Sequence, residues 1–433
     1  MRPPFTSNAA RQSLGFGAIV LCAGFAGPSQ ASGFIDDTQA NIESRTVYFN
    51  RDFRDGHSST EQGASKRDES AQGFILNLQS GYTEGTVGFG VDALGMLGFK
   101  LDSSPDSSNS GLLPSSGENP RGSADQYAKL GLTAKMRVSQ SVLKYGALLP
   151  DVPLLKYNDG RLLPTQFGGA MLTSRDVRDL SLMAARLDSY TARDSTDAQD
   201  IRLNCKNKRY ACNVTADHFD MYGVDYKINE RLTGQYHYAE LDDIYRQHFL
   251  GLLANQTLGE GVLKADLRVL KSDDSGAARA GSIDNRALSA MLAYAISGHT
   301  FSAGWQRMYG DSSMPYLDGS NPYLVNYVQV NDFAAAQERS WQLRYDYDFK
   351  AIGLNGLTFL TRYVNGDHIQ VPGSDQEGKE WERDSELKYV VQSGTFKNVS
   401  LRLRNATYRT NYEKFARDVD ETRLIISYNF SVL

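Results

Sequence analysis

From Arg45 to the C-terminus the chain divides into runs of about ten residues in which apolar and polar side chains alternate. The last run, residues 423–433, is the clearest. Its apolar face holds Leu424, Ile426, Tyr428, Phe430 and Val432, and its polar face holds Arg423, Ser427, Asn429 and Ser431. Ile425 is the exception. Residues 263–269, 341–349, 357–363 and 399–404 alternate in the same way, which predicts β-strands with one apolar and one polar face.

A soluble β-sandwich and a membrane β-barrel both produce this alternation. A sandwich repeats as domains of roughly 100 residues, whereas this pattern continues to residue 433 without a Pro- or Ser-rich linker between domains. Many runs carry an aromatic residue near an end, as expected for girdles at two membrane interfaces. Spanning strands must close, because lipid offers no partner for an open edge. Eighteen or nineteen candidate strands fit, and even numbers are usual in bacterial barrels, so we predict an all-β transmembrane antiparallel β-barrel of 18 strands.

The connections between these runs alternate in length, which is typical of a barrel built from hairpins. Long polar segments at 102–125, 192–217, 271–284, 311–323 and 365–384 are expected to be extracellular loops. Tight turns at 227–230 and 297–299 are expected on the periplasmic side.

Composition narrows the class further. A mean hydropathy of −0.44 excludes a helical membrane protein, while 24 Tyr and 19 Phe exclude a disordered chain. Residues 1–31 combine Arg2 and Arg11 with a short apolar run and a small-residue site, so we predict a signal peptide removed from a single barrel domain of residues 32–433. The remaining chain has 44 basic and 51 acidic residues, a net charge of −7, and no isolated basic cluster, so nucleic-acid binding is not supported.

After removal of the signal peptide two cysteines remain, Cys205 and Cys212, and an oxidising compartment favours a disulfide in the loop that holds them. We find no group of ligands for a metal and no motif for a cofactor.

One segment resembles neither a strand nor an ordinary loop. Residues 146–173 contain three prolines and an Asp-Gly turn, together with more leucine than a water-exposed loop carries. We expect a constriction loop that folds into the barrel, packs Leu154, Leu155, Leu162 and Leu163 on the inner wall, and presents Asp151, Asp159 and Arg161 to the pore. The alternative is a surface loop.

Arginines on the polar faces are the second candidate feature. The alternation places Arg402, Arg404 and Arg423 in the lumen, with Lys264, Arg268, Arg344 and Arg362 on other strands. Guanidinium groups bind carboxylates bidentately, and a row of shallow sites permits conduction with selectivity. The alternative is pairing with Asp266, Asp346 and Asp348, which we favour for Arg268 and Arg344.

These features resemble a known family, the OprD-like outer-membrane carboxylate channels of Pseudomonas and relatives. The resemblance covers nearly all of residues 32–433 and rests on the segments 33–37 (GFIDD), 48–52 (YFNRD), 85–93 (GTVGFGVDA), 243–247 (DIYRQ), 389–394 (YVVQSG) and 423–426 (RLII). It implies an 18-stranded barrel in which a basic ladder leads to an eyelet that small carboxylates cross.

The resemblance also implies roles for particular residues. The ladder falls on Arg402, Arg404 and Arg423, the eyelet arginine is Arg161, and Asp159 and Asp151 are similar to the eyelet acids of the branch that favours cyclic or aromatic carboxylates. Arg45 and Arg186 are similar to further basic positions of that branch. The alternation conflicts here, since it groups Arg45 with Val47 and Phe49, and Arg186 with Leu180, Leu182 and Ala184; a bulge or bent strand would reconcile the two.

The sequence therefore predicts a substrate-selective porin and not an enzyme. Its expected partners are small carboxylates, outer-membrane lipid and lipopolysaccharide, and the barrel-assembly machinery, in a monomer or weak homotrimer. One alternative, a surface protease or lipase, lacks a nucleophile motif around any of the six histidines, His57, His218, His237, His248, His299 and His368. The other, an adhesin or receptor acting through the long loops, stays open.

Overall fold

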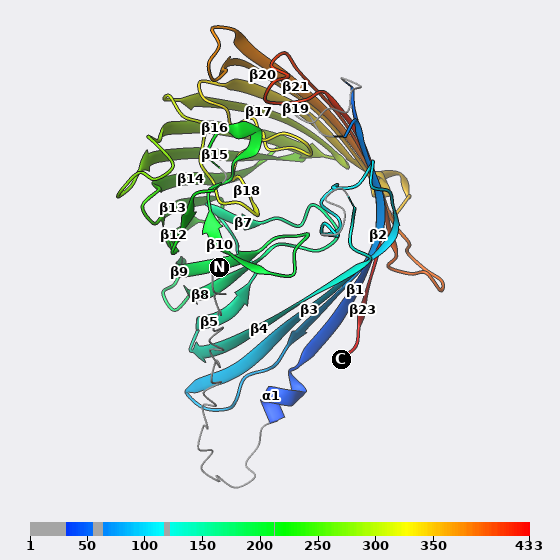
Figure 1. The fold of residues 1–433 in the computed structure, drawn as a ribbon. Coiled ribbons are helices and arrows are strands. Elements are labelled where there is room, and N and C mark those ends of the chain that lie inside the picture. Colours follow the sequence, from blue (N-terminus) through cyan, green and yellow to red (C-terminus); the bar gives the residue numbers. More distant parts are fainter. Residues whose placement is uncertain (1–31, 55–63, 117–121, 212) are drawn as a thin grey trace, which may run out of the picture.

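The chain forms a closed antiparallel β-barrel (Figure 1). The computed structural model describes residues 32–54, 64–116, 122–211 and 213–433, so the predicted signal peptide lies outside the described residues. In this part of the chain the main sheet has 20 strands, of which the short β10 and β11 extend one rim, and the other 18 form the wall. The first and last wall strands pair from Asn41 with Ser431 to Phe53 with Val419, which closes the ring. The predicted 18-stranded barrel is confirmed.

The wall strands are β1 (Gln39–Phe53), β2 (Lys66–Gln79), β3 (Val87–Ser103), β4 (Gln126–Val138), β5 (Ser141–Leu148), β8 (Gln166–Ser174), β9 (Leu180–Thr191), β12 (Phe219–Asn229), β13 (Leu232–Leu241), β14 (Tyr245–Leu258), β15 (Gly261–Asp274), β16 (Asp284–Ile296), β17 (His299–Tyr309), β19 (Arg339–Asp348), β20 (Leu357–Gln370), β21 (Glu377–Val390), β22 (Ser400–Thr410) and β23 (Val419–Ser431). Short elements lie between them: α1 (Ser32–Asp36), β6 (Asp151–Val152), β7 (Leu155–Tyr157), β10 (Ala198–Arg202), η1 (Lys206–Lys208), β11 (Thr215–Ala216), β18 (Ser320–Asn321) and η2 (Phe349–Ile352).

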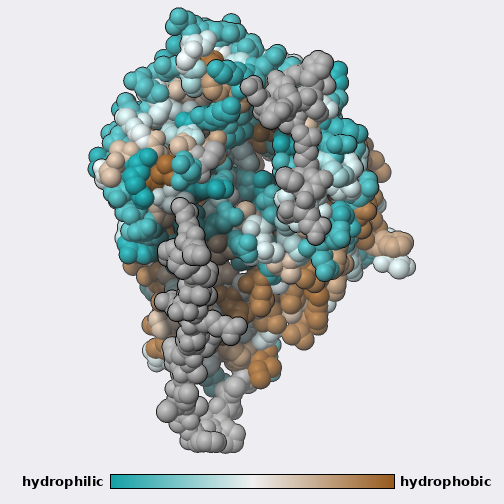
Figure 2. All heavy atoms as spheres, in the orientation of Figure 1, coloured by the Kyte–Doolittle hydropathy of each residue, from teal (hydrophilic) through white to brown (hydrophobic). Residues whose placement is uncertain are grey.

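The two faces of each wall strand differ in the way that a lipid-exposed barrel requires. On β4, the inward Lys129, Thr133 and Lys135 are buried, whereas the outward Leu130 and Leu132 are 71% and 59% exposed. Figure 2 shows hydrophobic residues gathered in the lower part of the visible face and hydrophilic residues in its upper part. Apolar side chains thus face outward, the reverse of a soluble core. No helix among the described residues has the length and apolarity needed to cross a membrane.

The alternation of β23 is observed as predicted, and its exception has a reason. Leu424, Ile426, Tyr428 and Phe430 are exposed on the outer face, and Arg423 is buried inside. Ile425 also points inward, where it packs against a cluster of buried apolar residues inside the barrel. The inner wall is therefore partly apolar, because loops cover it.

The turns follow the expected arrangement, except that most of the loop expected at 365–384 belongs to β20 and β21, which leaves residues 371–376 as the connection. Between β16 and β17, Ser297 and Gly298 have φ values of 49° and 83°, as a two-residue turn with positive φ at both central positions requires. Short turns of this kind lie at one end of the barrel and the long connections, such as 104–125 and 310–338, at the other. We take the end with the long connections as extracellular.

The constriction loop, residues 149–165, folds into the barrel as predicted. Leu154 and Leu155 belong to a large cluster of buried apolar residues on the inner faces of the wall strands between β8 and β17. Leu162 and Leu163 pack against Val47 and other buried residues of β1, β2 and β3. All four leucines are at most 5% exposed. Burying them on the inner wall removes apolar surface from water and fixes the loop there.

Glycine permits one close contact between the loop and the wall. A Cβ at Gly73 of β2 would lie 3.1 Å from Cγ of Leu162. A larger side chain at residue 73 would therefore push the loop away from the wall.

A second connection also enters the lumen, contrary to expectation. Residues 311–323 were predicted as an extracellular loop, but Ser320 and Asn321 form β18, which pairs with Tyr157 and Lys156 of β7. β6, β7 and β18 make a small three-stranded sheet, and Figure 1 shows β7 and β18 inside the ring of wall strands. Two loops that are far apart in the chain thus narrow the barrel together.

Candidate functional site

Two cavities meet at the constriction loop inside the barrel. One, of about 560 Å³, is bounded by β18 and the 310–338 connection, and the other, of about 430 Å³, lies along the inner faces of β1, β22 and β23. Asp159, Gly160, Arg161, Arg404 and Arg423 line both cavities. We call the region that these five residues line, where the two cavities adjoin, the eyelet.

Arg45 holds the constriction loop against β1. Its Nη1 lies 2.6 Å from Oδ1 of Asp159 and its Nη2 3.1 Å from Oδ2, a bidentate pair. Arg45 also donates to the carboxylate of Glu43 and to the backbone oxygens of Arg161 and Leu162. Because its donors are used within the protein, Arg45 positions the loop.

The arginine predicted at the eyelet has no carboxylate partner in the described residues. Arg161 donates from Nε to the backbone oxygen of Ser110 at 2.9 Å and from Nη1 to that of Gly160 at 2.9 Å. Burial lowers the pKa of the Arg161 guanidinium well below its usual value, and the like charges of Arg423 and Arg193 lower it further. Guanidinium groups stay protonated in proteins, so this environment favours an approaching anion.

Three of the arginines lie against one buried aromatic ring. The guanidinium carbons of Arg161, Arg423 and Arg51 lie 4.6, 5.3 and 5.5 Å from the centroid of the Phe49 ring. The ring is fully buried. Its electron-rich face stabilises cations that would otherwise repel one another.

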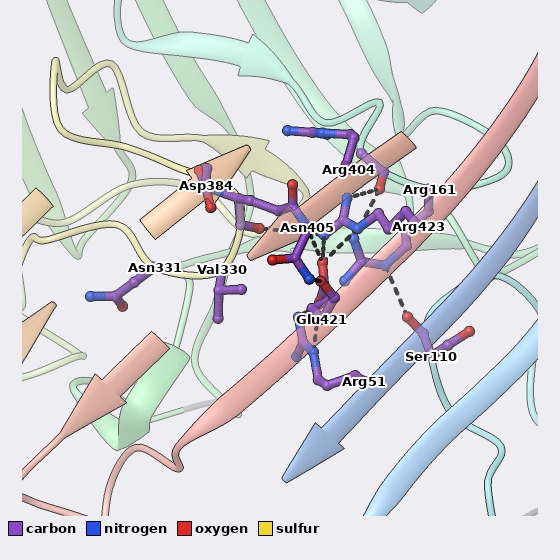
Figure 3. A network of polar contacts seen from close by, with 12 residues as sticks. Arg51, Ser110, Arg161, Val330, Asn331, Asp384, Arg404, Asn405, Glu421 and Arg423 are labelled. Carbon is purple, nitrogen blue, oxygen red and sulfur yellow. Dashed lines mark hydrogen bonds and ion pairs between the residues drawn. The ribbon is translucent and has the colours of Figure 1, made fainter. Parts of the chain in front are cut away.

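One buried carboxylate joins two of these arginines (Figure 3). Glu421 on β23 accepts from Nε of Arg51 at 2.7 Å and from Nε of Arg423 at 2.6 Å. Arg423 also donates to the backbone oxygen of Gly160 at 3.0 Å, and Gln329 of the 310–338 connection donates to Glu421 at 3.0 Å. This network ties both inward loops to the seam between β1 and β23.

The remaining ladder candidates face the same space. Arg402 and Arg404 on β22 share Glu386, with closest N–O distances of 3.4 and 3.0 Å. Arg402 lines the cavity beside β22 and β23, and Arg404 lines both cavities. Arg362 also lines the larger cavity, although both of its contacts go to Asp384.

Other predicted residues lie away from the eyelet. Asp151 belongs to the constriction loop but is 58% exposed and paired with Lys156 at 2.7 Å. Arg268 faces the lumen, where it pairs with Asp266 and lies over the ring of Tyr323 at 3.9 Å. Arg344 pairs with Asp346. Lys264 is exposed on the inward face of β15, nearer the periplasmic end, and lines neither cavity.

The alternation and the family resemblance conflict at Arg45 and Arg186. In the structure Arg45 faces the lumen and Arg186 does not. Arg45 does share a face with Val47 and Phe49, but this face points inward, because both apolar side chains pack against the loop leucines. No bulge is needed. Arg186 does not face the lumen: its neighbours Ala185 and Leu187 are buried inside, and Arg186 pairs with Asp220 on the outer surface at 2.6 Å. The pore position predicted for Arg186 is wrong.

The sequence prediction missed several residues of the site. Arg51 and Glu421 form its centre, and Arg193 lies beside the constriction loop with Nη1 3.1 Å from Oδ1 of Asn158. Alternation could have found Arg51, which lies two residues after Phe49 on the same face, and likewise Glu421 two residues before Arg423. Cys205 is disulfide-bonded, but Cys212 lies outside the described residues, so their pairing stays a prediction.

A closed 18-stranded barrel with an apolar outer face and a polar, narrowed lumen defines an outer-membrane channel. The model of the family described as "outer membrane porin, OprD family" matches residues 32–432. A porin-like protein of Pseudomonas putida, GalP, is 37% identical over 406 residues, which cover 93% of this chain and 94% of GalP.

Solved structures agree with this assignment. OccK9 (OpdG) of Pseudomonas aeruginosa is 46% identical with a TM-score of 0.87, over 92% of this chain and all of OccK9. OpdK of the same species, solved with vanillate, is 41% identical with a TM-score of 0.85, over 92% of this chain and all of OpdK. The chain belongs to the OprD family of outer-membrane porins, which are passive channels and not enzymes.

Proposed function

We propose that the chain mediates passive uptake of small solutes that bear a carboxylate, with a preference for aromatic or cyclic ones. The observation that carries the proposal is the charge on the walls of the two cavities. Eleven cationic side chains line them, against the three carboxylates of Glu43, Asp151 and Asp159; the cations are Arg45, Arg51, Lys156, Arg161, Arg193, Lys206, Arg362, Lys388, Arg402, Arg404 and Arg423.

The acids that balance the arginines lie mostly behind them. Glu421 is fully buried and Asp384 is 3% exposed, whereas the side chains of Arg402 and Arg404 are 37% and 21% exposed, so a solute in the lumen meets these two guanidinium groups first. A carboxylate passing Arg404 and Arg402 in turn exchanges one charge-assisted contact for the next, without a single deep site, while the buried Arg423 adds its positive charge from behind them.

The eyelet also offers features that suit a ring. The backbone of Gly160 lies beside the arginines, and Tyr157, Tyr316 and Tyr327 line the larger cavity. An aromatic carboxylate can place its ring against these surfaces while its charge meets a guanidinium. The presence of vanillate in the OpdK structure supports an aromatic carboxylate as the class to test.

The test is uptake into proteoliposomes of vanillate and of its neutral methyl ester. Vanillate is expected to enter faster through the native chain. Changing Arg402, Arg404 and Arg423 together to Gln removes three positive charges from the path of a passing carboxylate, two of them on guanidinium groups that it would bind. This triple variant is expected to take up vanillate more slowly, by on the order of tenfold for each guanidinium group that vanillate binds. Its uptake of the ester is expected to stay unchanged.

Arg268→Gln with Arg344→Gln serves as the matched control, because both arginines face the lumen but line neither cavity. It should leave vanillate uptake near the native rate. Equal rates for vanillate and the ester in the native chain, or equal loss of uptake in both variants, would refute the proposal.

A further inference from the structure

Four cations project from the outer wall of β15, β16, β17 and β19, close to the extracellular rim. Lys271, Arg286, Arg307 and Arg339 each lie next to buried, inward-facing residues, such as Leu270, Ala287, Met308 and Ser340, so their own side chains point away from the lumen. These strands are consecutive neighbours in the wall (Figure 1). The cations are thus unrelated to the pore.

The strand register brings like charges together. Lys271 lies directly opposite Arg286, and Arg307 lies directly opposite Arg339. Arg286 lies opposite Tyr309, two residues from Arg307, so the two pairs are diagonal neighbours. Like charges directly opposite on one face of a sheet destabilise it unless an anion lies between them.

The protein supplies no carboxylate partner to three of these cations in the described part of the chain, although the guanidinium carbon of Arg307 lies 4.3 Å from the centroid of the Tyr309 ring. Lys271 pairs with Asp273 at 3.1 Å. Among the described residues, no carboxylate lies within 4.0 Å of a guanidinium nitrogen of Arg286, Arg307 or Arg339. Asp367 is opposite Arg339 in the ladder, but its carboxylate is 2.5 Å from Nδ1 of His368. We call Arg286, Arg307 and Arg339 the outer arginine cluster.

The height of the cluster matches that of lipid headgroups. Trp305 and Trp341 form a cross-strand pair directly on its periplasmic side and are 47% and 43% exposed. Further from the rim, Leu292 and Leu343 are 50% and 57% exposed on the same outer face. Aromatic residues mark the membrane interface and exposed leucines the hydrocarbon layer, so the cluster lies at the headgroups of the extracellular leaflet.

We propose that the outer arginine cluster binds the phosphate groups of lipid A, the phosphorylated glycolipid of that leaflet. Phosphate oxygens match the fork of a guanidinium group and would separate the opposed arginines. The acyl chains would then lie along the exposed face that includes Trp305, Leu292 and Leu343. A second copy of this chain is disfavoured as occupant, because two such clusters would repel each other.

The experiment is native mass spectrometry of the full chain in detergent, titrated with bisphosphorylated lipid A and with its dephosphorylated form. The native chain is expected to bind the phosphorylated form more tightly. Arg286→Gln, Arg307→Gln and Arg339→Gln together should weaken that binding by on the order of 100-fold, at about fivefold for each cation near an anionic surface.

The control variant removes three exposed cations from the periplasmic turns: Arg178→Gln, Arg231→Gln and Lys350→Gln. It should bind phosphorylated lipid A like the native chain, and unchanged single-channel conductance in both variants shows that the barrel is intact. Equal affinity for the two lipid forms, or equal weakening in the two variants, would overturn the proposal. So would a dimer of the chain that only the outer-arginine variant loses.

Discussion

The pair between Arg45 and Asp159 allows the electrostatics of the eyelet to be tested without removing its loop. Asp159→Asn keeps the shape of the side chain and an oxygen that can accept from Arg45. Arg45 retains Glu43 and two backbone oxygens as partners, so the loop should stay in place. The substitution removes one negative charge from a wall that both cavities share.

The size of the effect follows from distance and exposure. An anion in the eyelet passes at roughly 5 Å from residue 159, where a unit charge contributes roughly 0.8 kcal/mol in a water-like medium and roughly 3 kcal/mol at an effective dielectric constant of about 20. The Asp159 side chain is 38% exposed, which favours the lower end. We expect about 1 kcal/mol, or about fivefold, in favour of an anion and a similar change against a cation, so the anion-to-cation permeability ratio should rise by about fivefold or more.

The assay is the reversal potential of single channels in a planar bilayer under a salt gradient. Asp151→Asn is the matched control, since Asp151 lies in the same loop but is 58% exposed and paired with Lys156. Its expected change is less than about twofold, as for a surface ion pair. If the ratio stays unchanged in Asp159→Asn, or shifts equally in both variants, the eyelet carboxylate does not set selectivity.

Three further predictions concern the two inward loops. Gly73→Val should displace the constriction loop from the wall at Leu162, at a cost of about 1–3 kcal/mol in the free energy of unfolding, and should change single-channel conductance; unchanged conductance would contradict this. Leu162→Ala should cost about 2–5 kcal/mol, measured by urea unfolding in vesicles, and a cost below about 1 kcal/mol would mean that the loop is not packed as described. Burial, and next the charge of Glu380, raise the pKa of Glu338 well above its ordinary 4.5. The 310–338 connection should therefore be most stable below pH 4.5 and loosen as the pH rises toward the raised value. Protease cleavage of that connection should increase over this range, and Glu338→Gln should make the increase smaller; an increase as large as in the native chain would contradict this.

The sequence predicts the barrel well because lipid and water impose the alternation on every wall strand. The alternation fails on the parts of the inner wall that are covered by protein and face neither lipid nor water. Val47, Phe49 and Ile425 look like lipid-facing residues, yet they lie inside, because the leucines of the constriction loop cover them. For Arg45 the family resemblance correctly predicted a side chain that faces the lumen. For Arg186 the alternation correctly predicted a side chain on the outer face.

The eyelet was only partly predictable for a related reason. Its centre depends on contacts across the closing seam of the barrel, where Arg51 meets Glu421, 370 positions away in the chain. The alternation along each strand does not contain this pairing. The path of the 310–338 connection into the lumen was equally hidden, because β18 is only two residues long and its partner β7 lies in another loop.

The pairing of β7 with β18 has a consequence for changing what the channel admits. Since backbone hydrogen bonds join the constriction loop to the 310–338 connection, neither segment can be replaced as an independent cassette. A chimera that receives only residues 149–165 from a relative would leave the edge of β18 without its native partner. A chimera that also receives the 310–338 connection would keep a matched pair of β7 and β18. Loop grafts between members of the family should therefore be made in pairs.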